Sequence, residues 1–224
     1  MVEITDGQLK SDFGAATGEA TRSGLYSRRI KRVCDVLAIL IAAPIVVPLV
    51  AVFAMLVSRD GGPAFYKQER VGRFGRIFKC WKLRTMVVDA DRQLEAYLEA
   101  DPEARAEWER TQKLKNDPRV TRVGQILRKT SLDELPQLWN VLRGDMSLVG
   151  PRPMMPEQMD IYPGQAYYQM RPGITGLWQV SDRNSSAFAA RAVHDTAYAN
   201  RVSFTTDVGV LLATVPAVVR GTGC

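Results

Sequence analysis

The longest apolar stretch of the chain covers residues 36–57 and is interrupted only by Pro44 and Pro48. Its length of about 22 residues is that of a helix able to span a membrane. Basic residues flank it on both sides, so a single span would carry one basic cluster to the outer face, against the usual charge bias. These flanking residues are Arg28, Arg29, Lys31 and Arg32 before the stretch and Arg59, Lys67, Arg70, Arg73 and Arg76 after it.

The two prolines indicate how this stretch meets a membrane. A proline inside a helix removes an amide donor and clashes with a preceding carbonyl, so Pro44 and Pro48 predict a break between two helical halves. Each half has about 11 residues, or roughly 16 Å of helix, which reaches only part-way through an apolar core of about 30 Å. We therefore expect a re-entrant helix-break-helix that returns to the same face. A kinked helix that spans the membrane is the alternative.

The rest of the pattern predicts a mainly helical α+β fold with a small β-hairpin. Aromatic and basic residues alternate over residues 65–86, which is typical of a hairpin or an extended loop. Asp101 as N-cap and Pro102 in the first turn predict a helix that runs to about residue 115. The further expected helices cover residues 89–100, 120–127, 131–142 and 208–219.

Composition narrows the functional class. The chain has 224 residues, a net charge of +6 and 46% apolar residues, which suits a folded protein that meets nucleic acid, anionic lipid or a polyphosphate. The cysteines Cys34, Cys80 and Cys224 form no CxxC pair, which favours a reducing, cytosolic setting over secretion. Because His194 is the one histidine, a histidine zinc site and a Ser-His-Asp triad are disfavoured, and His194 is expected to be a packing or hydrogen-bonding residue.

An adjacent acid pair, Asp133 and Glu134, stands at the start of the helix expected over residues 131–142. One interpretation is structural, because the segment from Ser131 to Glu134 fits a capping box in which Glu134 accepts from the Ser131 amide. The other is chemical. Amides at a helix start together with fixed arginines bind anions, and an ionised aspartate there can ligate a hard cation or attack phosphorus. Basic residues near in sequence are Arg128, Lys129, Arg143 and Arg152, the last in a rigid Gly-Pro-Arg-Pro turn.

Other phosphate motifs change this picture little. The chain has neither a Walker A sequence nor a G-x-G-x-x-G sequence, so a nucleotide site on a P-loop or Rossmann frame is disfavoured. Lys82 and Arg84 lie in KCWKLR, residues 79–84, which interleaves bases with an aromatic residue. We expect these two residues to bind phosphate. A solvated hairpin face is the alternative interpretation.

Several long blocks in the right order resemble the bacterial sugar transferase family of small monotopic phosphoglycosyl transferases. The blocks are KQERVGRFGRIFKCWKLRTM, DPRVTRVGQILRKTSLDELPQLWNVLRGDMSLVGPRP and MRPGITGLWQVSDRN. The resemblance implies a re-entrant membrane helix, interfacial helices and a small cytoplasmic catalytic head. It also implies transfer of a sugar 1-phosphate from a UDP-sugar to undecaprenyl phosphate at the cytoplasmic face of the bacterial inner membrane, as the first membrane step of exopolysaccharide synthesis.

The resemblance also implies roles for single residues. Asp133 matches the family's nucleophile, which forms an aspartyl-phosphosugar and releases UMP, and Glu134 completes the pair that holds Mg²⁺ with it. Arg128 and Arg152 match basic positions that bind phosphates, and Arg171 and Gln179 are candidates for donor binding. The expected sections are a disordered tail over residues 1–24, a basic segment with the re-entrant helix over 25–58, and a catalytic domain over 59–224.

Two departures from the family pattern and the set of partners complete these expectations. Ala43 precedes Pro44 where relatives often have serine, and Asp182 stands where relatives have glycine, so the sugar stays open between galactose and glucose. The expected partners are the UDP-sugar, undecaprenyl phosphate, membrane lipid and a second copy in a homodimer, with no nucleic acid. A non-enzymatic basic adaptor at the membrane surface is the alternative function, and it predicts that Asp133 is dispensable.

Overall fold

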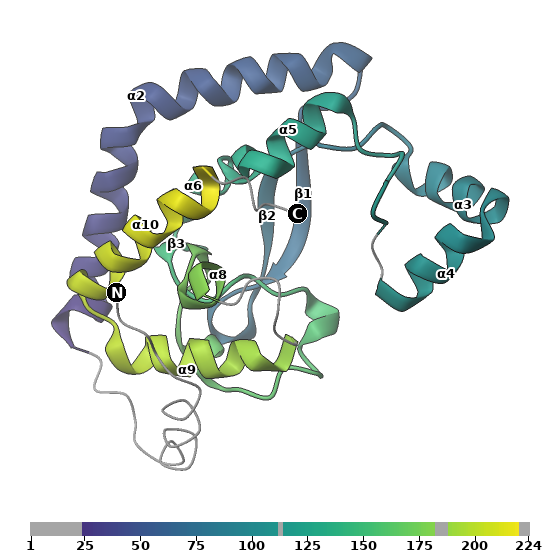
Figure 1. The fold of residues 1–224 in the computed structure, drawn as a ribbon. Helices are drawn as coiled ribbons and strands as arrows, with labels where there is room; N and C mark the ends of the chain where they lie inside the picture. The colour runs from purple at the N-terminus through teal and green to yellow at the C-terminus, as the bar shows by residue number, and fades with distance from the viewer. Residues whose placement is uncertain (1–23, 112–113, 182–187, 220–224) are drawn as a thin grey trace. The chain divides into compact units, whose positions relative to one another are not determined.

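The computed structural model describes residues 24–111, 114–181 and 188–219, and its fold is mainly helical with short strands (Figure 1). The strands are β1 (Phe65–Val71), β2 (Ile77–Leu83), β3 (Ser147–Val149) and β4 (Gly173–Thr175). The helices are α2 (Lys31–Val57), α3 (Ala90–Ala100), α4 (Pro102–Thr111), α5 (Arg122–Thr130), α6 (Gln137–Arg143), α7 (Ala166–Gln169), α8 (Leu177–Ser181), α9 (Arg191–Arg201) and α10 (Phe204–Val219). Apart from Gly24, the predicted tail lies outside the described residues.

Helix α2 contains the long apolar stretch. It is helical from Lys31 to Val57 with Pro44 and Pro48 inside it, so the predicted break between two halves is not seen in the secondary structure. The helix is long and apolar enough to cross a membrane by length and composition. Many of its apolar side chains face outward, among them Ile41 at 79% and Ile45 at 76% exposure. The predicted return to the same membrane face stays a prediction.

The expected hairpin is confirmed, and so are the helices expected over residues 89–100, 120–127 and 208–219, with small shifts at their ends. β1 and β2 form a two-stranded sheet joined by a turn in which Phe74 and Gly75 have positive φ angles. The N-cap predicted at Asp101 is also confirmed, because its Oδ1 accepts from the amides of Glu103 at 2.9 Å and Ala104 at 3.0 Å. The described part of the helix that it caps, α4, covers Pro102–Thr111, and residues 114 and 115 are not helical.

The helix expected over residues 131–142 is wrong in its first half. Leu132–Glu134 form a 3₁₀ turn and the α-helix begins only at Gln137. Pro136 has no amide hydrogen, so a helix from residue 131 could not form its bond to the Leu132 carbonyl. The capping box is wrong as well, because Ser131 makes no side-chain cap and instead adopts φ 56° as the C-cap of α5.

The described contacts divide the chain into two compact units, which are described one at a time. The first unit takes in the described parts of Met1–Ala42, Gln68–Cys80 and Gln137–Ala217, and the second takes in those of Ala43–Lys67, Trp81–Pro136 and Val218–Cys224. Helix α2 and the hairpin therefore contribute residues to both units. These units differ from the sections that the sequence predicted, whose limits stay predictions.

The first unit is organised around a short parallel ladder between β3 and β4. Ser147 pairs with Gly173 and Val149 pairs with Thr175. The backbones come so close beyond β3 that a Cβ on Gly173 would lie 2.1 Å from the Gly150 nitrogen. Glycine is required here because any side chain would collide with main-chain atoms. The ladder thus brings the Gly-Pro-Arg-Pro turn and the Arg-Pro-Gly segment together, although neither short strand was predicted.

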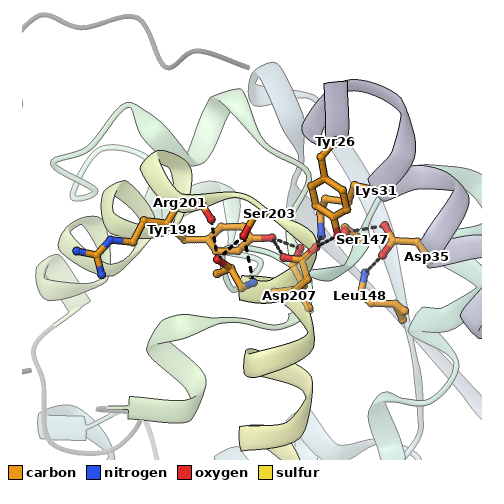
Figure 2. Close-up of polar contacts among 11 residues, drawn as sticks. Tyr26, Lys31, Asp35, Ser147, Leu148, Tyr198, Arg201, Ser203 and Asp207 are labelled. Carbon is orange, nitrogen blue, oxygen red and sulfur yellow. Dashed lines mark hydrogen bonds and ion pairs between the residues drawn. The ribbon is translucent and has the colours of Figure 1, made fainter. Parts of the chain in front are cut away.

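Buried polar contacts hold the start of α2 within the first unit (Figure 2). The Asp207 carboxylate accepts from the hydroxyls of Tyr26 at 2.7 Å and Tyr198 at 2.6 Å and pairs with Lys31. One turn along α2, Asp35 accepts from the Ser147 hydroxyl at 2.7 Å. Charged residues at the beginning of this apolar helix are therefore accounted for, because each is paired with a polar group of the head.

The second unit has its own apolar core beneath the acid pair. Val57, Leu83 and Leu127 are buried there, and Leu132 packs against them from the 3₁₀ turn. These residues come from α2, β2 and α5, so the core fixes the positions of those elements relative to the turn. The side chains next to the core residues in sequence, Lys82 and Asp133, are placed by this packing.

Candidate functional site

The acid pair sits on a short turn whose backbone is set by its neighbours. The positive φ of Ser131 ends α5 and reverses the chain into the 3₁₀ turn Leu132–Glu134. A non-glycine residue in this left-handed region is uncommon and is held by its surroundings. The burial of Leu132 in the core supplies that constraint. Asp133 and Glu134 are thereby carried on a rigid element rather than on a loose loop.

Lys82 on β2 supplies a cation to both acids. Its Nζ lies 2.8 Å from Glu134 Oε1 and 3.7 Å from Asp133 Oδ2. The sequence placed Lys82 among the phosphate-binding candidates, whereas the structure places it against the carboxylates. Lys82 makes a hydrogen-bonded ion pair with Glu134 and only a longer contact with Asp133. Lys82 therefore holds the Asp133 carboxylate less tightly than the Glu134 carboxylate.

Asp133 is largely buried, with 9% of its surface exposed. Burial raises the pKa of this carboxyl above its ordinary value, Lys82 lowers it, Glu134 raises it and Arg128 lowers it. Removal from water disfavours the charged form, and the two cations compensate for part of that effect. The group is therefore a poorly solvated carboxylate that depends on nearby positive charge, and such a group is a stronger nucleophile than a hydrated one.

Arg128 is the second cation of this site. Its Nε donates to the Thr85 hydroxyl at 2.9 Å, and burial lowers the pKa of its guanidinium. Among the described residues, its terminal guanidinium nitrogens make no hydrogen bond or ion pair. A guanidinium that is fixed at one nitrogen and open at the other two fits a phosphate with two parallel bonds. The phosphate-binding role expected for Arg128 stays a prediction.

The donor set of the site fits magnesium only in part. Within residues 24–111, 114–181 and 188–219 there is no group of three or more His, Cys, Asp or Glu side chains that could hold a metal. Asp133 and Glu134 offer carboxylate oxygens, and Mg²⁺ commonly binds through one or two carboxylates together with substrate phosphates. The two acids therefore fit a magnesium ion that arrives with a phosphate ligand, and not a site made by protein alone.

Arg84 has a structural place in the second unit, which differs from the phosphate-binding role expected for it. It is 9% exposed. Its Nε donates to the Pro63 carbonyl at 2.7 Å, and its terminal nitrogens donate to Asp60 and to the carbonyls of Val57 at 3.0 Å and Met86 at 2.8 Å. A guanidinium has five N–H donors, and Arg84 uses all of them on these partners. Arg84 therefore links β2 to the C-terminal end of α2.

The remaining predicted residues lie in the first unit. Arg171 Nε donates to the Gly144 carbonyl at 2.9 Å, and burial lowers its pKa. Gln179 is 8% exposed, and its Oε1 has no hydrogen-bond partner within the part of the chain that the structure describes. Arg152 is partly buried beyond β3. The structure thus groups Lys82, Arg128, Asp133 and Glu134 in one unit and places Arg152, Arg171 and Gln179 in the other.

Sequence reasoning missed residues that the structure makes prominent. Thr85 orients Arg128, yet a lone threonine after a strand gives no signal of such a role. Arg191 and Asp195 lie four residues apart on α9, a helix that was not predicted. The spacing of an arginine and an aspartate at positions i and i+4 was the signal from which this helix could have been predicted. Asp182, whose identity bears on the sugar, lies outside the described residues.

Comparison with known proteins gives a consistent result. The profile of the family described as bacterial sugar transferase matches residues 26–221. The undecaprenyl-phosphate galactose phosphotransferase of Salmonella typhimurium is 48% identical over 203 residues, which is 88% of this chain and 42% of that protein. The chain therefore spans less than half the length of that relative.

Other relatives are closer in length. The exopolysaccharide production protein ExoY of Rhizobium meliloti is 46% identical over 196 residues, or 86% of this chain and 87% of that protein. The UDP-glucose:undecaprenyl-phosphate glucose-1-phosphate transferase of Caulobacter vibrioides is 40% identical over 197 residues, or 83% and 68%. With the family profile covering nearly the whole described chain, this protein belongs to the bacterial sugar transferase family.

Proposed function

We propose that this chain transfers a sugar 1-phosphate from a UDP-sugar to undecaprenyl phosphate at a membrane surface. The observation that carries this proposal is the buried Asp133 beside Glu134, Lys82 and Arg128. The names of the relatives in Salmonella and Caulobacter supply the lipid and the class of sugar donor. They differ in the sugar, galactose in one and glucose in the other, so the proposal covers both hexoses.

In the first step Asp133 attacks the phosphorus that carries the sugar. A carboxylate oxygen forms the new P–O bond, the bond to the bridging oxygen breaks, and UMP leaves with that electron pair. The product is an aspartyl-phosphosugar, a mixed anhydride that retains its transfer potential. In the second step an oxygen of the lipid phosphate attacks the same phosphorus and the Asp133 carboxylate leaves. The enzyme is regenerated and the lipid carries the sugar through a pyrophosphate.

Charge explains why the acids stand beside two cations. Attack of an anion on a pyrophosphate is opposed by repulsion, which positioned positive charge reduces. Mg²⁺, when bound with the donor, would supply such charge, and Glu134 together with Asp133 would hold it. Arg128 would bind a phosphate with its open nitrogens. Lys82 would keep the acids ionised before the donor arrives, because it already pairs with both.

The membrane setting follows from α2. Its exposed apolar side chains need a nonpolar environment, and the phosphate of a long-chain lipid lies at the headgroup level. We propose that α2 is re-entrant and that the catalytic head lies at the cytoplasmic face of the inner membrane. The basic residues on both sides of the apolar stretch support this arrangement.

A donor panel tests the function. The full chain in membrane-derived nanodiscs receives UDP-galactose, UDP-glucose or another UDP-sugar, with undecaprenyl phosphate and Mg²⁺. We expect sustained UMP release over many turnovers to require one of these donors and the lipid, with a lipid-linked phosphosugar as the other product, whereas donor alone should release at most one UMP per chain. Absence of UMP with every donor, in protein that is folded and supplied with lipid, would leave the adaptor function as the better explanation.

A further inference from the structure

One face of α5 rests on the main chain of Thr85, just beyond the end of β2. The Thr85 carbonyl accepts from the amide of Thr121 at 3.1 Å and from its hydroxyl at 3.4 Å. A Cβ added to Gly124 would lie 2.0 Å from the same carbonyl oxygen, so only glycine allows this approach. The start of α5 is therefore docked on the backbone of residue 85, whatever side chain that residue carries.

The side chain of Thr85 holds a second point on the same face of α5. Arg128 lies about one helical turn after Gly124, and its Nε donates to the Thr85 hydroxyl at 2.9 Å. Within the described ranges, this bond is the one hydrogen bond or ion pair that the Arg128 side chain makes. Thr85 is 8% exposed, so bulk water has little access to replace the bond. The orientation of this guanidinium thus depends on a single hydroxyl.

Two carboxylates act on the charge of Arg128, and one of them is already paired. Burial lowers the pKa of Arg128, whereas Asp133 and, to a smaller extent, Asp117 raise it. The Asp117 carboxylate accepts two bonds from the guanidinium of Arg119, at 2.8 and 2.7 Å. Asp133 has no such two-bond partner in the described part of the chain, since its contact with Lys82 is 3.7 Å long. Arg128 therefore serves the acid pair rather than Asp117.

One short segment, residues 82–85, places both cations beside the acid pair. Lys82 contacts the acids directly, Leu83 is buried in the core of the second unit, and Thr85 holds Arg128. All of these residues belong to the second unit. Because Lys82 and Thr85 use different side chains for different cations, a change of the Thr85 hydroxyl alters the hold on Arg128 and leaves the Lys82 contacts in place.

We propose that Thr85 is a positioning residue for the transfer reaction, which acts by fixing Arg128 toward the phosphate group that Asp133 attacks. This role rests on the proposed function. A guanidinium that is oriented before the donor arrives loses less conformational freedom on binding it. It also stabilises the charge that develops during transfer without having to reorganise. Thr85 itself touches no substrate, and its hydroxyl is needed as the acceptor for Arg128.

Thr85→Val tests this role, because valine has the shape of threonine but lacks the acceptor, and the backbone contacts with α5 remain. In nanodiscs with lipid and radiolabelled donor, we expect kcat for UMP release to fall by about tenfold, the loss expected for a bond to a charged group. Thr85→Ser keeps the hydroxyl and should restore most of the rate. Thr130→Val is the matched control on α5 and should leave the rate unchanged, because the Thr130 hydroxyl donates to the carbonyls of Ile126 and Leu127.

A double-mutant cycle separates positioning from a general structural effect. If Thr85 acts through Arg128, Thr85→Val should cause no further loss of kcat in an Arg128→Met chain, whereas independent effects would multiply. Melting temperatures show which variants are folded, and Thr85→Ala is the second variant if Thr85→Val does not fold.

Three results overturn the positioning role and leave the proposed function intact. They are an unchanged kcat in folded Thr85→Val, a Thr85→Ser chain as slow as Thr85→Val, and the full loss of kcat again in the Arg128→Met chain. Absence of UMP release by the unaltered chain overturns the proposed function and the positioning role together, so the two failures are distinguishable.

Discussion

Asp133 is a carboxylate that the fold buries next to its own cations. An exposed aspartate would be hydrated and a weak nucleophile, whereas one at 9% exposure is held by Lys82 and Arg128 in place of water. The position of Lys82 is set by β2 and that of Asp133 by the 3₁₀ turn. At the scale of residues, the proposed chemistry therefore depends on the contacts of Asp133 with Lys82 and Arg128 within the second unit.

Replacing Asp133 by Asn tests the nucleophile. The amide keeps the size of the side chain but cannot form the acyl phosphate, so we expect UMP release to fall by about a thousandfold or more. Mass spectrometry after incubation with donor alone should find the phosphosugar on Asp133 of the unaltered chain. Asp160→Asn, at an exposed position, is the control and should behave normally. Near-normal turnover of a folded Asp133→Asn chain would exclude covalent catalysis by this residue.

Replacing Glu134 by Gln tests the magnesium role. Gln retains an acceptor for Lys82 but loses the charge, so the Mg²⁺ concentration for half-maximal activity should rise several-fold together with a lower rate. Because Ser131 to Glu134 forms no capping box, the substitution does not disturb a helix cap. Glu69→Gln, which is exposed on β1, is the matched control. An unchanged Mg²⁺ requirement would mean that Glu134 only orients Lys82.

Replacing Asp195 by Asn tests the effect of its buried charge on stability. Burial raises the pKa of Asp195 to about 7 in the folded protein, above an unfolded value of about 3.9. The folded state therefore binds more protons between about pH 4 and 7, and stability falls as pH rises through that window. The Asn variant should lack this contribution and gain on the unaltered chain by up to a few kcal/mol at pH 8. Melting temperatures at pH 5 and 8 check this, and a constant difference would contradict it.

Elements add what single residues do not explain, and Arg84 is the example. It joins β2 to the end of α2 and to the segment that follows, through Asp60 and main-chain carbonyls. In the sequence Arg84 is one of several basic residues in KCWKLR and carries no signal of this structural role. In the fold Arg84 links β2 to the end of α2. Lys82, two residues earlier on the same face of the strand, contacts the acid pair instead.

Removing the hydrogen bonds of Arg84 should destabilise the second unit. We expect Arg84→Ala to lower the free energy of unfolding by roughly 2–4 kcal/mol, because carbonyls and a carboxylate lose their donors. Asp60→Asn should cost less, since the Asp60 side chain is 39% exposed and water can replace part of the contact. Thermal unfolding in one detergent measures both. Equal, small losses would show that Arg84 is not a buried structural link.

The topology of α2 is a second question at this scale. Single cysteines near Arg28 and Arg59 are placed in a chain lacking Cys34, Cys80 and Cys224. If α2 is re-entrant, both cysteines should be shielded from an impermeant thiol reagent in intact cells, because both basic flanks stay in the cytoplasm. Labelling at one end alone would show a spanning helix. Permeabilised cells, in which both sites should react, are the control.

For the whole molecule, the division into two units matters most. The acid pair with Lys82 and Arg128 belongs to the second unit, and the arginines of the Gly-Pro-Arg-Pro turn and α9 belong to the first. Each unit has its own buried core. Under the proposed function, the nucleophile Asp133 and the cations beside it, Lys82 and Arg128, all belong to the second unit.

The sequence alone determined the features that local rules control. The apolar length of α2, the hairpin over residues 65–86 and the cap at Asp101 depend on neighbours in the chain, and each was predicted. The acid pair with its adjacent arginines was also visible, and its family followed from the motifs.

Only the tertiary structure decided what distant residues do to one another. Lys82 and Glu134 are far apart in the chain, and their contact exists because Leu83 and Leu132 share one core. Arg84 was assigned a structural place by carbonyls that no pattern indicates. The strands β3 and β4 are three residues each, too short for a periodic signal, and pair because glycines let two backbones touch. Burial and long-range contact set these outcomes, and neither is written in the local order of residues.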